Sequence, residues 1–335
     1  MLNRKVPLYL LFITLVLCLV GSFLTFRFIN QNAEAEQSSI SNGPQPICNL
    51  NIARLKGFEF IKPILYAEPA CESADFSPLK NELTALINNF KLSGDITSAS
   101  VYVREFGQAR WMVINENEKY SPGSLLKVPE LIAFCKMNEL KPGFFEKSVT
   151  YKTKTETHRN ITFKSKHITL GQSYTIKELL KYMIVYSDNE ATLLLNSIID
   201  RNIFNNVFTD LGLPAPDYSA NDYPMTTAAY SSFLKELYNS TYLNATHSEF
   251  CMNLMSQSDY TDGLVSGLPK NCVAVHKFGE GGYPNAPNFN ETAIVYCNNK
   301  AYLLTVMSKG TDLVKMPNFV KAISQLVYNK MTAII

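Results

Sequence analysis

Three short segments of the sequence place side chains that could carry out acyl transfer. The first contains Ser124 and Lys127, in a stretch that reads Ser-Leu-Leu-Lys. Positions three apart share one face of a helix, and free backbone N–H groups at a helix amino end favour developing negative charge. A serine hydroxyl is a weak nucleophile alone, and a neighbouring neutral lysine amine can accept its proton. The pair indicates nucleophilic catalysis, although alone it also fits an N-cap serine beside a surface lysine.

The second segment reads Ser-Asp-Asn over residues 187–189, and the third reads His-Lys-Phe-Gly over residues 276–279. Alone, the second would be a turn before a helix, and the third a strand end with a solvated lysine. In this order the three segments are similar to the S-x-x-K, S-D-N and K-T-G signature of class A β-lactamases and penicillin-binding proteins. The sequence therefore resembles this family of penicillin-recognising serine enzymes, from about residue 76 to its carboxyl end.

The resemblance implies roles for four residues that handle the proton and the substrate amide. Ser124 would be the acylated nucleophile, and Lys127 would accept its proton or form part of the relay. Ser187 would pass a proton to the leaving nitrogen. Asn189 would hold the substrate amide and help to place Lys127.

The third segment is implied to bind the substrate and its developing charge. Lys277, followed by Gly279, would supply positive charge near Ser187 and the substrate carboxylate. The backbone N–H groups of Ser124 and Glu280 would form the oxyanion hole. The family needs no metal or cofactor, and we expect none here.

Two departures from the family pattern bear on activity. Phe278 stands where the family has a Thr or Ser hydroxyl that binds the substrate carboxylate. The family's Glu that activates the deacylating water is also missing, because Glu190 is the only Glu between Asn189 and Thr226. Asp217 or Asp222 could replace it, although loop carboxylates are usually just solvated. We therefore expect a serine hydrolase acylated at Ser124 by β-lactams or D-Ala-D-Ala-type peptides, with slow deacylation.

A different class of function stays open beside this one. Phe278 also fits a non-catalytic domain that senses peptidoglycan or β-lactams with the same fold. The retained Ser124, Lys127 and Ser187 favour catalysis.

An apolar run precedes these segments. Residues 6–26 carry no charge, and 21 helical residues span a hydrocarbon core of about 30 Å. Arg4 and Lys5 precede the run, which favours a cytoplasmic amino end and export of the remainder. We expect an uncleaved anchor at residues 1–28 and a catalytic domain outside the cytoplasm; a signal peptide cleaved near residues 33–35 is the alternative.

The pattern of elements predicts an α+β fold at residues 76–335, behind a membrane-proximal connector at residues 29–75. An antiparallel sheet flanked by terminal helices would join its first and last strands, with an all-helical lobe inserted between them. The expected strands cover residues 99–106, 111–115, 273–278, 292–297 and 302–307, and the expected helices residues 77–91, 124–140, 176–186, 189–199, 227–238 and 317–331.

Composition limits the partners. The 335 residues carry a net charge of +2, which argues against a nucleic-acid binder. We expect a monomer that meets a β-lactam or peptidoglycan-peptide substrate and the membrane. Six cysteines outside the apolar run allow 15 disulfide pairings. The shortest loops favour Cys48 with Cys71 and Cys251 with Cys272, while free buried thiols remain an equal alternative.

Overall fold

The computed structural model describes residues 48–154, 162–220 and 222–334. The chain divides into two compact units, residues 1–48 and 49–335, and the description below concerns the second. The apolar run at residues 6–26 lies outside the described residues. Within the described part, no helix is both long and apolar enough to cross a bilayer.

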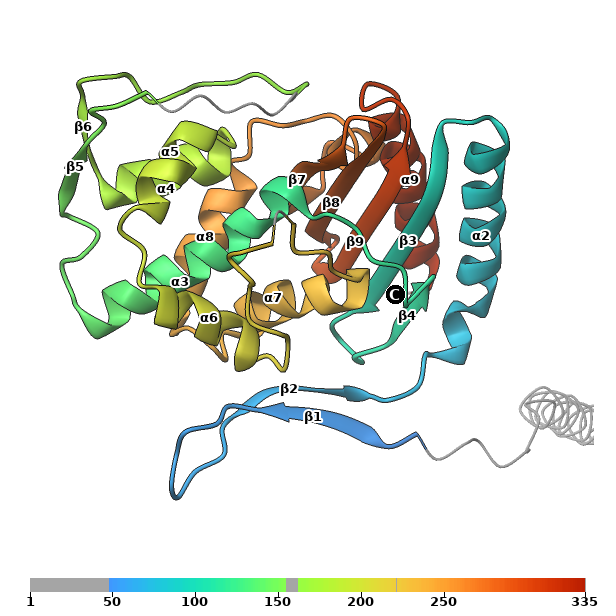
Figure 1. The fold of residues 1–335 in the computed structure, drawn as a ribbon. Coiled ribbons are helices and arrows are strands. Elements are labelled where there is room, and N and C mark those ends of the chain that lie inside the picture. Colours follow the sequence, from blue (N-terminus) through green and yellow to red (C-terminus); the bar gives the residue numbers. More distant parts are fainter. Residues whose placement is uncertain (1–47, 155–161, 221, 335) are drawn as a thin grey trace, which may run out of the picture. The chain divides into compact units, whose positions relative to one another are not determined.

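The second unit is built on an antiparallel sheet of five strands in the order β4-β3-β9-β8-β7. The first strands in sequence lie beside the last, as predicted, because β3 pairs with β9 (Figure 1). The central strands β3 and β9 are buried along most of their length, including several of their polar side chains. The strands are β3 (Ile96–Glu105), β4 (Trp111–Ile114), β7 (Val273–Tyr283), β8 (Ala286–Cys297) and β9 (Lys300–Gly310).

Two terminal helices, α2 (Ser77–Leu92) and α9 (Met316–Ile334), pack on the sheet and on each other. Pro78 occupies the first turn of α2, where a missing N–H costs nothing. Leu79, Leu83 and Ile87 recur every four residues, and all three are buried. This stripe is what the sequence predicted for the helix.

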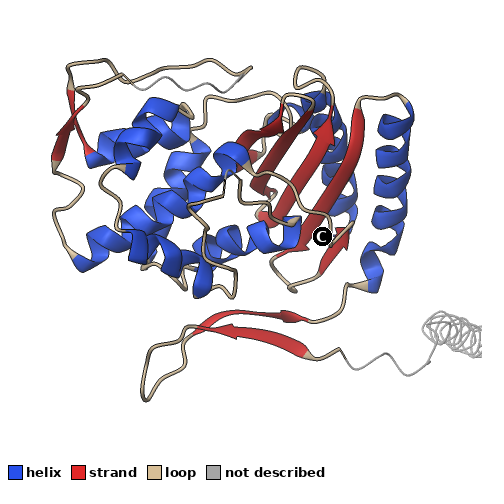
Figure 2. Cartoon of the chain, in the orientation of Figure 1, coloured by secondary structure: helices blue, strands red, loops and turns tan. Residues whose placement is uncertain are grey.

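The helical lobe lies between β4 and β7 in sequence, as expected, and separate from the sheet layer in space (Figure 2). Two of its helices, α6 and α8, escaped the sequence reading. Both are short and follow an N-cap, Asp200 for α6 and Asn244 for α8, whose side chains accept backbone N–H bonds. The lobe comprises α3 (Lys127–Leu140), α4 (Ile176–Val185), α5 (Asn189–Asn196), α6 (Arg201–Thr209), α7 (Thr227–Asn239), α8 (Ala245–Ser256) and the strand pair β5 (Ser148–Thr150) and β6 (Ser173–Thr175).

The predicted connector at residues 29–75 is not uniform. Its second half forms an antiparallel hairpin of β1 (Leu50–Arg54) and β2 (Ile64–Pro69), followed by a short helix η1 (Ala74–Phe76). The hairpin belongs to the same unit as the sheet and helices. The sequence reading missed the hairpin, because the partners of its buried charge, Glu68, lie far along the chain.

Glu68 lies at the centre of the contact between the hairpin and the rest of the domain, residues 77–334. Its carboxylate is buried and forms ion pairs with Arg104 of β3 and with Lys235 of α7, at 3.0 Å from the Lys235 Nζ. Trp111 Nε1 donates to the carbonyl oxygen of Pro69 at 2.7 Å, and Thr241 Oγ1 donates to that of Leu65 at 2.7 Å. A two-stranded hairpin is marginal alone, so these contacts hold it in place.

The cysteines correct one predicted disulfide. Cys272 is bonded to Cys297, and not to Cys251. Residues 273 and 296 are partners in the β7–β8 ladder, so the next pair outward, 272 and 297, is brought opposite by register. Cys251 is instead a buried thiol, with its Sγ 3.3 Å from that of Cys135. Cys48 and Cys71 are each disulfide-bonded.

Glu236, which lies beside the contact between Thr241 and the hairpin, makes the free energy of unfolding depend on pH. Burial raises the pKa of Glu236 to about 7 from 4.5. The Thr241 hydroxyl, which donates to the Leu65 carbonyl oxygen, also donates to Glu236 Oε2, and this bond lowers the pKa by less than burial raises it. Between pH 4.5 and 7 the unfolded chain therefore loses the Glu236 proton first, and stability falls as pH rises.

Glu236→Gln is expected to raise the free energy of unfolding at pH 8, by up to about 3 kcal/mol. The gain should vanish at about pH 3, below both pKa values, where Glu236 is protonated in both states. Urea unfolding at the two pH values measures this. An equal effect of the variant at both would show that Glu236 is ionised in the folded protein.

Candidate active site

The turn that carries Ser124 lies directly against the edge strand β7. A short helix, η2 (Gly123–Leu126), contains Ser124 and leads straight into α3, which begins at Lys127. Gly123 has a φ of +55°, and a Cβ there would lie 2.0 Å from the carbonyl oxygen of Glu280. A Cβ on Gly279 would lie 2.4 Å from the carbonyl oxygen of Pro122. Only glycine permits this approach, which places Ser124 beside the backbone of Glu280.

Side chains from the sheet and the helical lobe fix this turn. Asn288 Oδ1 accepts the Ser121 N–H at 2.9 Å, and Asn290 Nδ2 donates to the Ser121 carbonyl oxygen at 2.8 Å. From α7, the buried Tyr230 hydroxyl donates to the carbonyl oxygen of Leu125 at 2.8 Å. The nucleophile turn is therefore held from both layers.

The second segment forms a strained turn between α4 and α5. Ser187 has a φ of +53°, a conformation that costs a non-glycine residue about 1–3 kcal/mol. Asp188 offsets this cost, because its buried carboxylate caps α5 through the Glu190 N–H and also accepts the Ile168 N–H. The sequence reading of residues 187–189 as a turn and an N-cap is thus correct, and the turn aims Ser187 at two lysines.

Lys127 and Lys277 converge on the Ser187 hydroxyl. The Lys277 Nζ lies 2.9 Å from Ser187 Oγ, and the Lys127 Nζ lies 3.3 Å from it. Lys127 also donates to the Ser187 carbonyl oxygen at 2.6 Å and to Asn189 Oδ1 at 2.8 Å. Four residues selected from the sequence therefore lie in one network of contacts. They are Lys127 of α3, Ser187 of the α4–α5 turn, Asn189 of α5 and Lys277 of β7.

Both lysines are buried, with 3% of Lys127 and 0% of Lys277 exposed. Burial lowers the pKa of Lys277 well below its ordinary value, and the charge of Lys127 lowers it further. Two ammonium groups so near one oxygen repel each other in a poorly solvated place. The arrangement therefore favours one neutral amine and one ammonium, which can exchange a proton through Ser187.

Phe278 contributes its ring to an aromatic cluster and offers no hydroxyl to a substrate. The ring stacks on Tyr260 with centroids 4.0 Å apart and meets Phe163 edge-on at 5.0 Å. Its carbonyl oxygen accepts from the Lys277 Nζ at 2.8 Å. The neighbouring Glu280 carboxylate accepts the N–H and the hydroxyl of Thr162.

A cavity of about 760 Å³ adjoins the Ser124 turn. On the catalytic side it is lined by Ser121, Gly123, Leu126 and Glu280, and Ser124 itself is not among its lining residues. Other parts of its lining include residues 216–218, 220, 222, 223 and 311–314. The cavity is an extension of the site rather than its centre.

The two aspartates expected as possible bases differ in position. Asp217 is exposed and accepts from Ser219 of its own turn, which lowers its pKa. Asp222 is half-buried and accepts the Ser121 hydroxyl at 2.7 Å, next to the nucleophile turn. Both line the cavity.

Glu130 also lines the cavity, and the sequence reading missed it. It is 8% exposed and lies one helical turn beyond Lys127. The signal was present, since Glu130 is the only carboxylate in the otherwise apolar stretch 128–134.

A sequence profile described as the beta-lactamase enzyme family matches residues 78–331. The chain belongs to this family. No curated protein sequence matches the chain.

Solved structures of the family share the fold. A class A β-lactamase from Mycobacterium abscessus is 17% identical with a TM-score of 0.63, covering 75% of this chain and 98% of its own. A β-lactamase from Chitinophaga pinensis is 18% identical with a TM-score of 0.63, covering 75% of this chain and all of its own. A mutant of PBP-A, described as an acyl-enzyme complex with penicillin G, is 17% identical with a TM-score of 0.61, covering 76% and 97%. At these identities the likeness shows the fold.

The two lysines generate a trade-off between stability and activity. The folded state keeps Lys277 neutral at pH values where the unfolded chain protonates it, so stability falls as pH drops below 10.5. Lys277→Met is expected to raise Tm at pH 7, with a gain that shrinks towards pH 10.5, and to slow acylation of Ser124. Thermal unfolding at both pH values measures the first effect. A lower Tm at both would mean that Lys277 stabilises the fold.

Proposed function

We propose that this chain is a membrane-anchored, exported serine hydrolase whose Ser124 is acylated by β-lactams or by D-Ala-D-Ala-type peptide amides, and that its acyl-enzyme is hydrolysed slowly. The observation that carries the proposal is the convergence of the Lys127 and Lys277 amines on the Ser187 hydroxyl. Family membership supports the reaction class. The uncharged run at residues 6–26 supports the anchor.

Acylation follows from this geometry. The Lys127 ammonium first passes its proton through the Ser187 hydroxyl to the neutral Lys277 amine; Ser124 Oγ then attacks the amide carbonyl carbon, and its proton passes to the Lys127 amine. The C–N bond then breaks, and the leaving nitrogen takes the Ser187 hydroxyl proton. The Lys127 ammonium, 3.3 Å from Ser187 Oγ, replaces that proton. Backbone N–H groups of Ser124 and Glu280, on segments that lie against each other, stabilise the oxyanion.

Slow deacylation is supported by the surroundings of the two loop aspartates. Hydrolysis needs a base that removes a proton from water near the ester. Asp217 is exposed and bound within its own turn, and the Ser121 hydroxyl occupies one oxygen of Asp222. We propose that neither replaces the family's Glu efficiently, so the acyl-enzyme accumulates.

The third segment shapes the substrate preference. Without a hydroxyl at position 278, a substrate carboxylate loses a hydrogen bond of about 1.5–3 kcal/mol. The Glu280 carboxylate adds negative charge to the wall beside Ser124. We propose that the site accepts carboxylate-bearing penicillins more slowly than uncharged relatives of the same ring.

A second candidate function is a non-catalytic peptidoglycan or β-lactam sensor. The burial of Phe278 in an aromatic cluster favours it, because this residue is committed to packing rather than to substrate.

Incubation with a fluorescent penicillin and with a chromogenic cephalosporin tests the proposal. We expect a covalent adduct that survives denaturation, little turnover, and no adduct in Ser124→Ala. Ser93→Ala is the matched control, because Ser93 is exposed at the carboxyl end of α2, outside the site, and is expected to leave the adduct intact. Rapid cephalosporin hydrolysis would contradict slow deacylation. Absence of an adduct with both probes would favour the sensor.

Glu280→Gln tests the charge at the site wall. The amide keeps an oxygen to accept from Thr162 and removes the negative charge, so acylation by a carboxylate-bearing penicillin is expected to accelerate about tenfold. The methyl ester of the same penicillin is the control and should react equally with both proteins. Stopped-flow acylation rates measure both, and an unchanged rate for the acid would overturn the role given to Glu280.

A further inference from the structure

We infer that the tip of the β1–β2 hairpin binds the surface of an anionic lipid bilayer and so orients the catalytic domain on the membrane. The hairpin tip is defined as residues 54–64, the loop between the strands with its two flanking residues. The inference rests on the proposed membrane anchor, which brings the hairpin to the bilayer.

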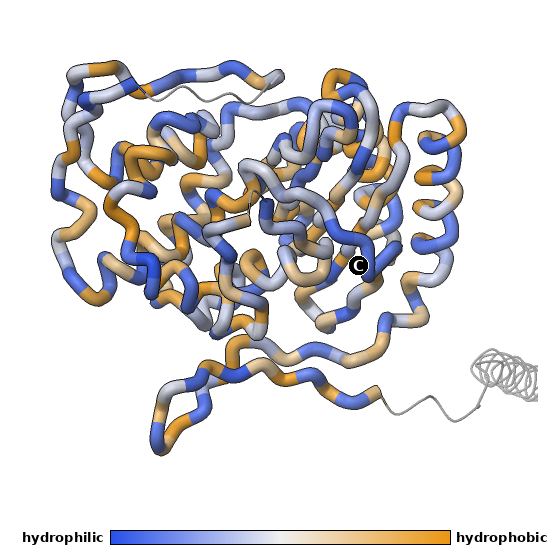
Figure 3. Tube along the Cα trace, in the orientation of Figure 1, coloured by the Kyte–Doolittle hydropathy of each residue, from blue (hydrophilic) through white to orange (hydrophobic). Residues whose placement is uncertain are grey.

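Exposed apolar side chains concentrate on the hairpin. Fifteen large hydrophobic residues of the described chain are exposed, and six of them lie within residues 50–64. The six are Leu50 (65%), Ile52 (42%), Phe58 (50%), Phe60 (88%), Ile61 (57%) and Ile64 (47%). Figure 3 shows apolar and polar residues interleaved around the loop. A cluster of this kind marks an interaction site, whereas single exposed residues need no explanation.

Strand register separates the exposed apolar residues of β1 from the face that contacts the rest of the domain. Leu50 and Ile52 lie two apart and point to one side, while Asn51 and its partner Glu68 lie on the other side. Glu68 contacts the rest of the domain, so Leu50 and Ile52 lie on the face away from it. A register shift between Ala53 and Arg54, which pairs with Ile64, bends the hairpin where the tip begins.

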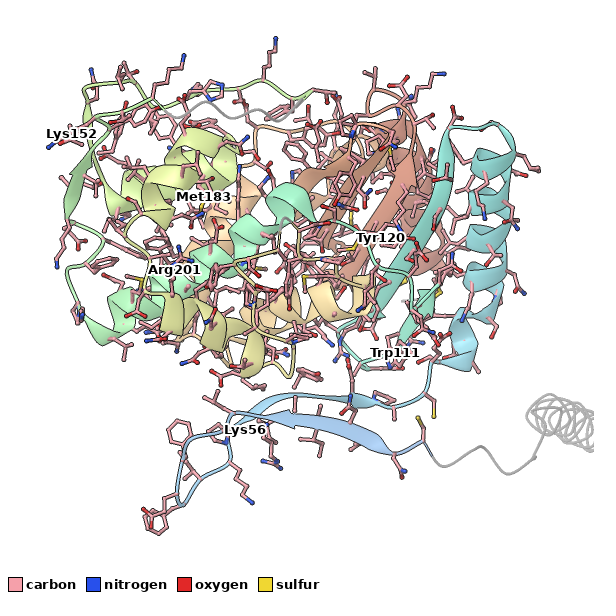
Figure 4. The ribbon with its side chains drawn as sticks, viewed as in Figure 1. Lys56, Trp111, Tyr120, Lys152, Met183 and Arg201 are labelled. Carbon is pink, nitrogen blue, oxygen red and sulfur yellow. A yellow bond between two sulfur atoms is a disulfide. The ribbon has the colours of Figure 1, made fainter. Side chains whose placement is uncertain are left out.

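The charge of the tip selects an anionic partner. Arg54, Lys56 and Lys62 surround the apolar residues, and Glu59 is the one acid among residues 54–64, which gives a net charge of +2. Figure 4 labels Lys56 on the hairpin. Segments that bind anionic membranes combine lysine and arginine, which are attracted to the headgroups, with apolar side chains such as phenylalanine and isoleucine, which enter the interface. Two copies of the tip would repel each other, which disfavours self-association.

The length of the preceding chain fits this placement. Residues 27–49 separate the apolar run from β1, and fully extended they reach at most about 80 Å. The hairpin is therefore the first described element within reach of the bilayer.

The hairpin is also firmly held. The ion pairs of Glu68 and the hydrogen bond from Trp111 to Pro69 fix β2 to β3, β4 and α7. Binding of the tip to lipid would consequently set the orientation of the whole unit.

The test uses the full chain reconstituted in phosphatidylcholine vesicles, with or without phosphatidylglycerol. An environment-sensitive fluorophore is attached at residue 60 through an unnatural amino acid, which avoids the cysteines. The control label is at Leu92, which is 87% exposed, as Phe60 is 88%, but lies at the end of α2. Lipids with brominated acyl chains report contact with the bilayer by quenching.

We expect a blue shift and quenching at residue 60 that increase with phosphatidylglycerol, with neither at residue 92. The triple variant Arg54→Glu, Lys56→Glu, Lys62→Glu should lose both changes, and an unaltered Tm would show that it folds.

Equal signals at residues 60 and 92 in vesicles that retain the chain would overturn the inference while the anchor stands. A chain extracted by alkaline carbonate, yet quenched at residue 60 before extraction, would refute the anchor alone. Emission that depends on protein concentration and not on lipid would identify self-association and overturn the inference.

Discussion

Two amines held within hydrogen-bonding distance of one serine hydroxyl are the constraint on which this site depends. Lys127 and Lys277 come from different layers, and Ser187 lies between them only because its turn adopts a left-handed conformation. Burial makes a doubly protonated pair costly. The fold thus supplies a proton acceptor at Ser187 at the expense of stability, a common arrangement in active sites.

Close approach of two backbones provides the second part of the site. The Ser124 turn and the edge strand β7 touch at Gly123 and Gly279, where any side chain would collide with a carbonyl group. An edge strand has one side free of sheet partners, and here the nucleophile turn occupies that side. Asn288 and Asn290 of β8 then fix the turn, so the sheet positions the nucleophile although Ser124 belongs to the helical lobe.

The same strand explains how the site departs from its family. Phe278 is buried with Tyr260 and Phe163, and Glu280 is held by Thr162. Residues 162 and 163 therefore contact Phe278 and Glu280. These are two residues of β7 whose side chains cannot donate a hydrogen bond to a substrate carboxylate. Phe278, Glu280 and the segment that contains Thr162 and Phe163 thus form one structural unit.

The sequence by itself determined the order of strands and helices and most of the reacting groups, because both follow from local patterns. Alternation and four-residue stripes predicted β3, β9 and α2, and the three short segments predicted that Ser187, Lys127 and Lys277 would meet. Only the tertiary structure decided contacts between distant residues. It placed Cys272 opposite Cys297 through strand register, buried Glu68 between Arg104 and Lys235, and put Glu130 on the cavity wall. These outcomes depend on which surfaces pack together, and spacing along a chain does not encode that.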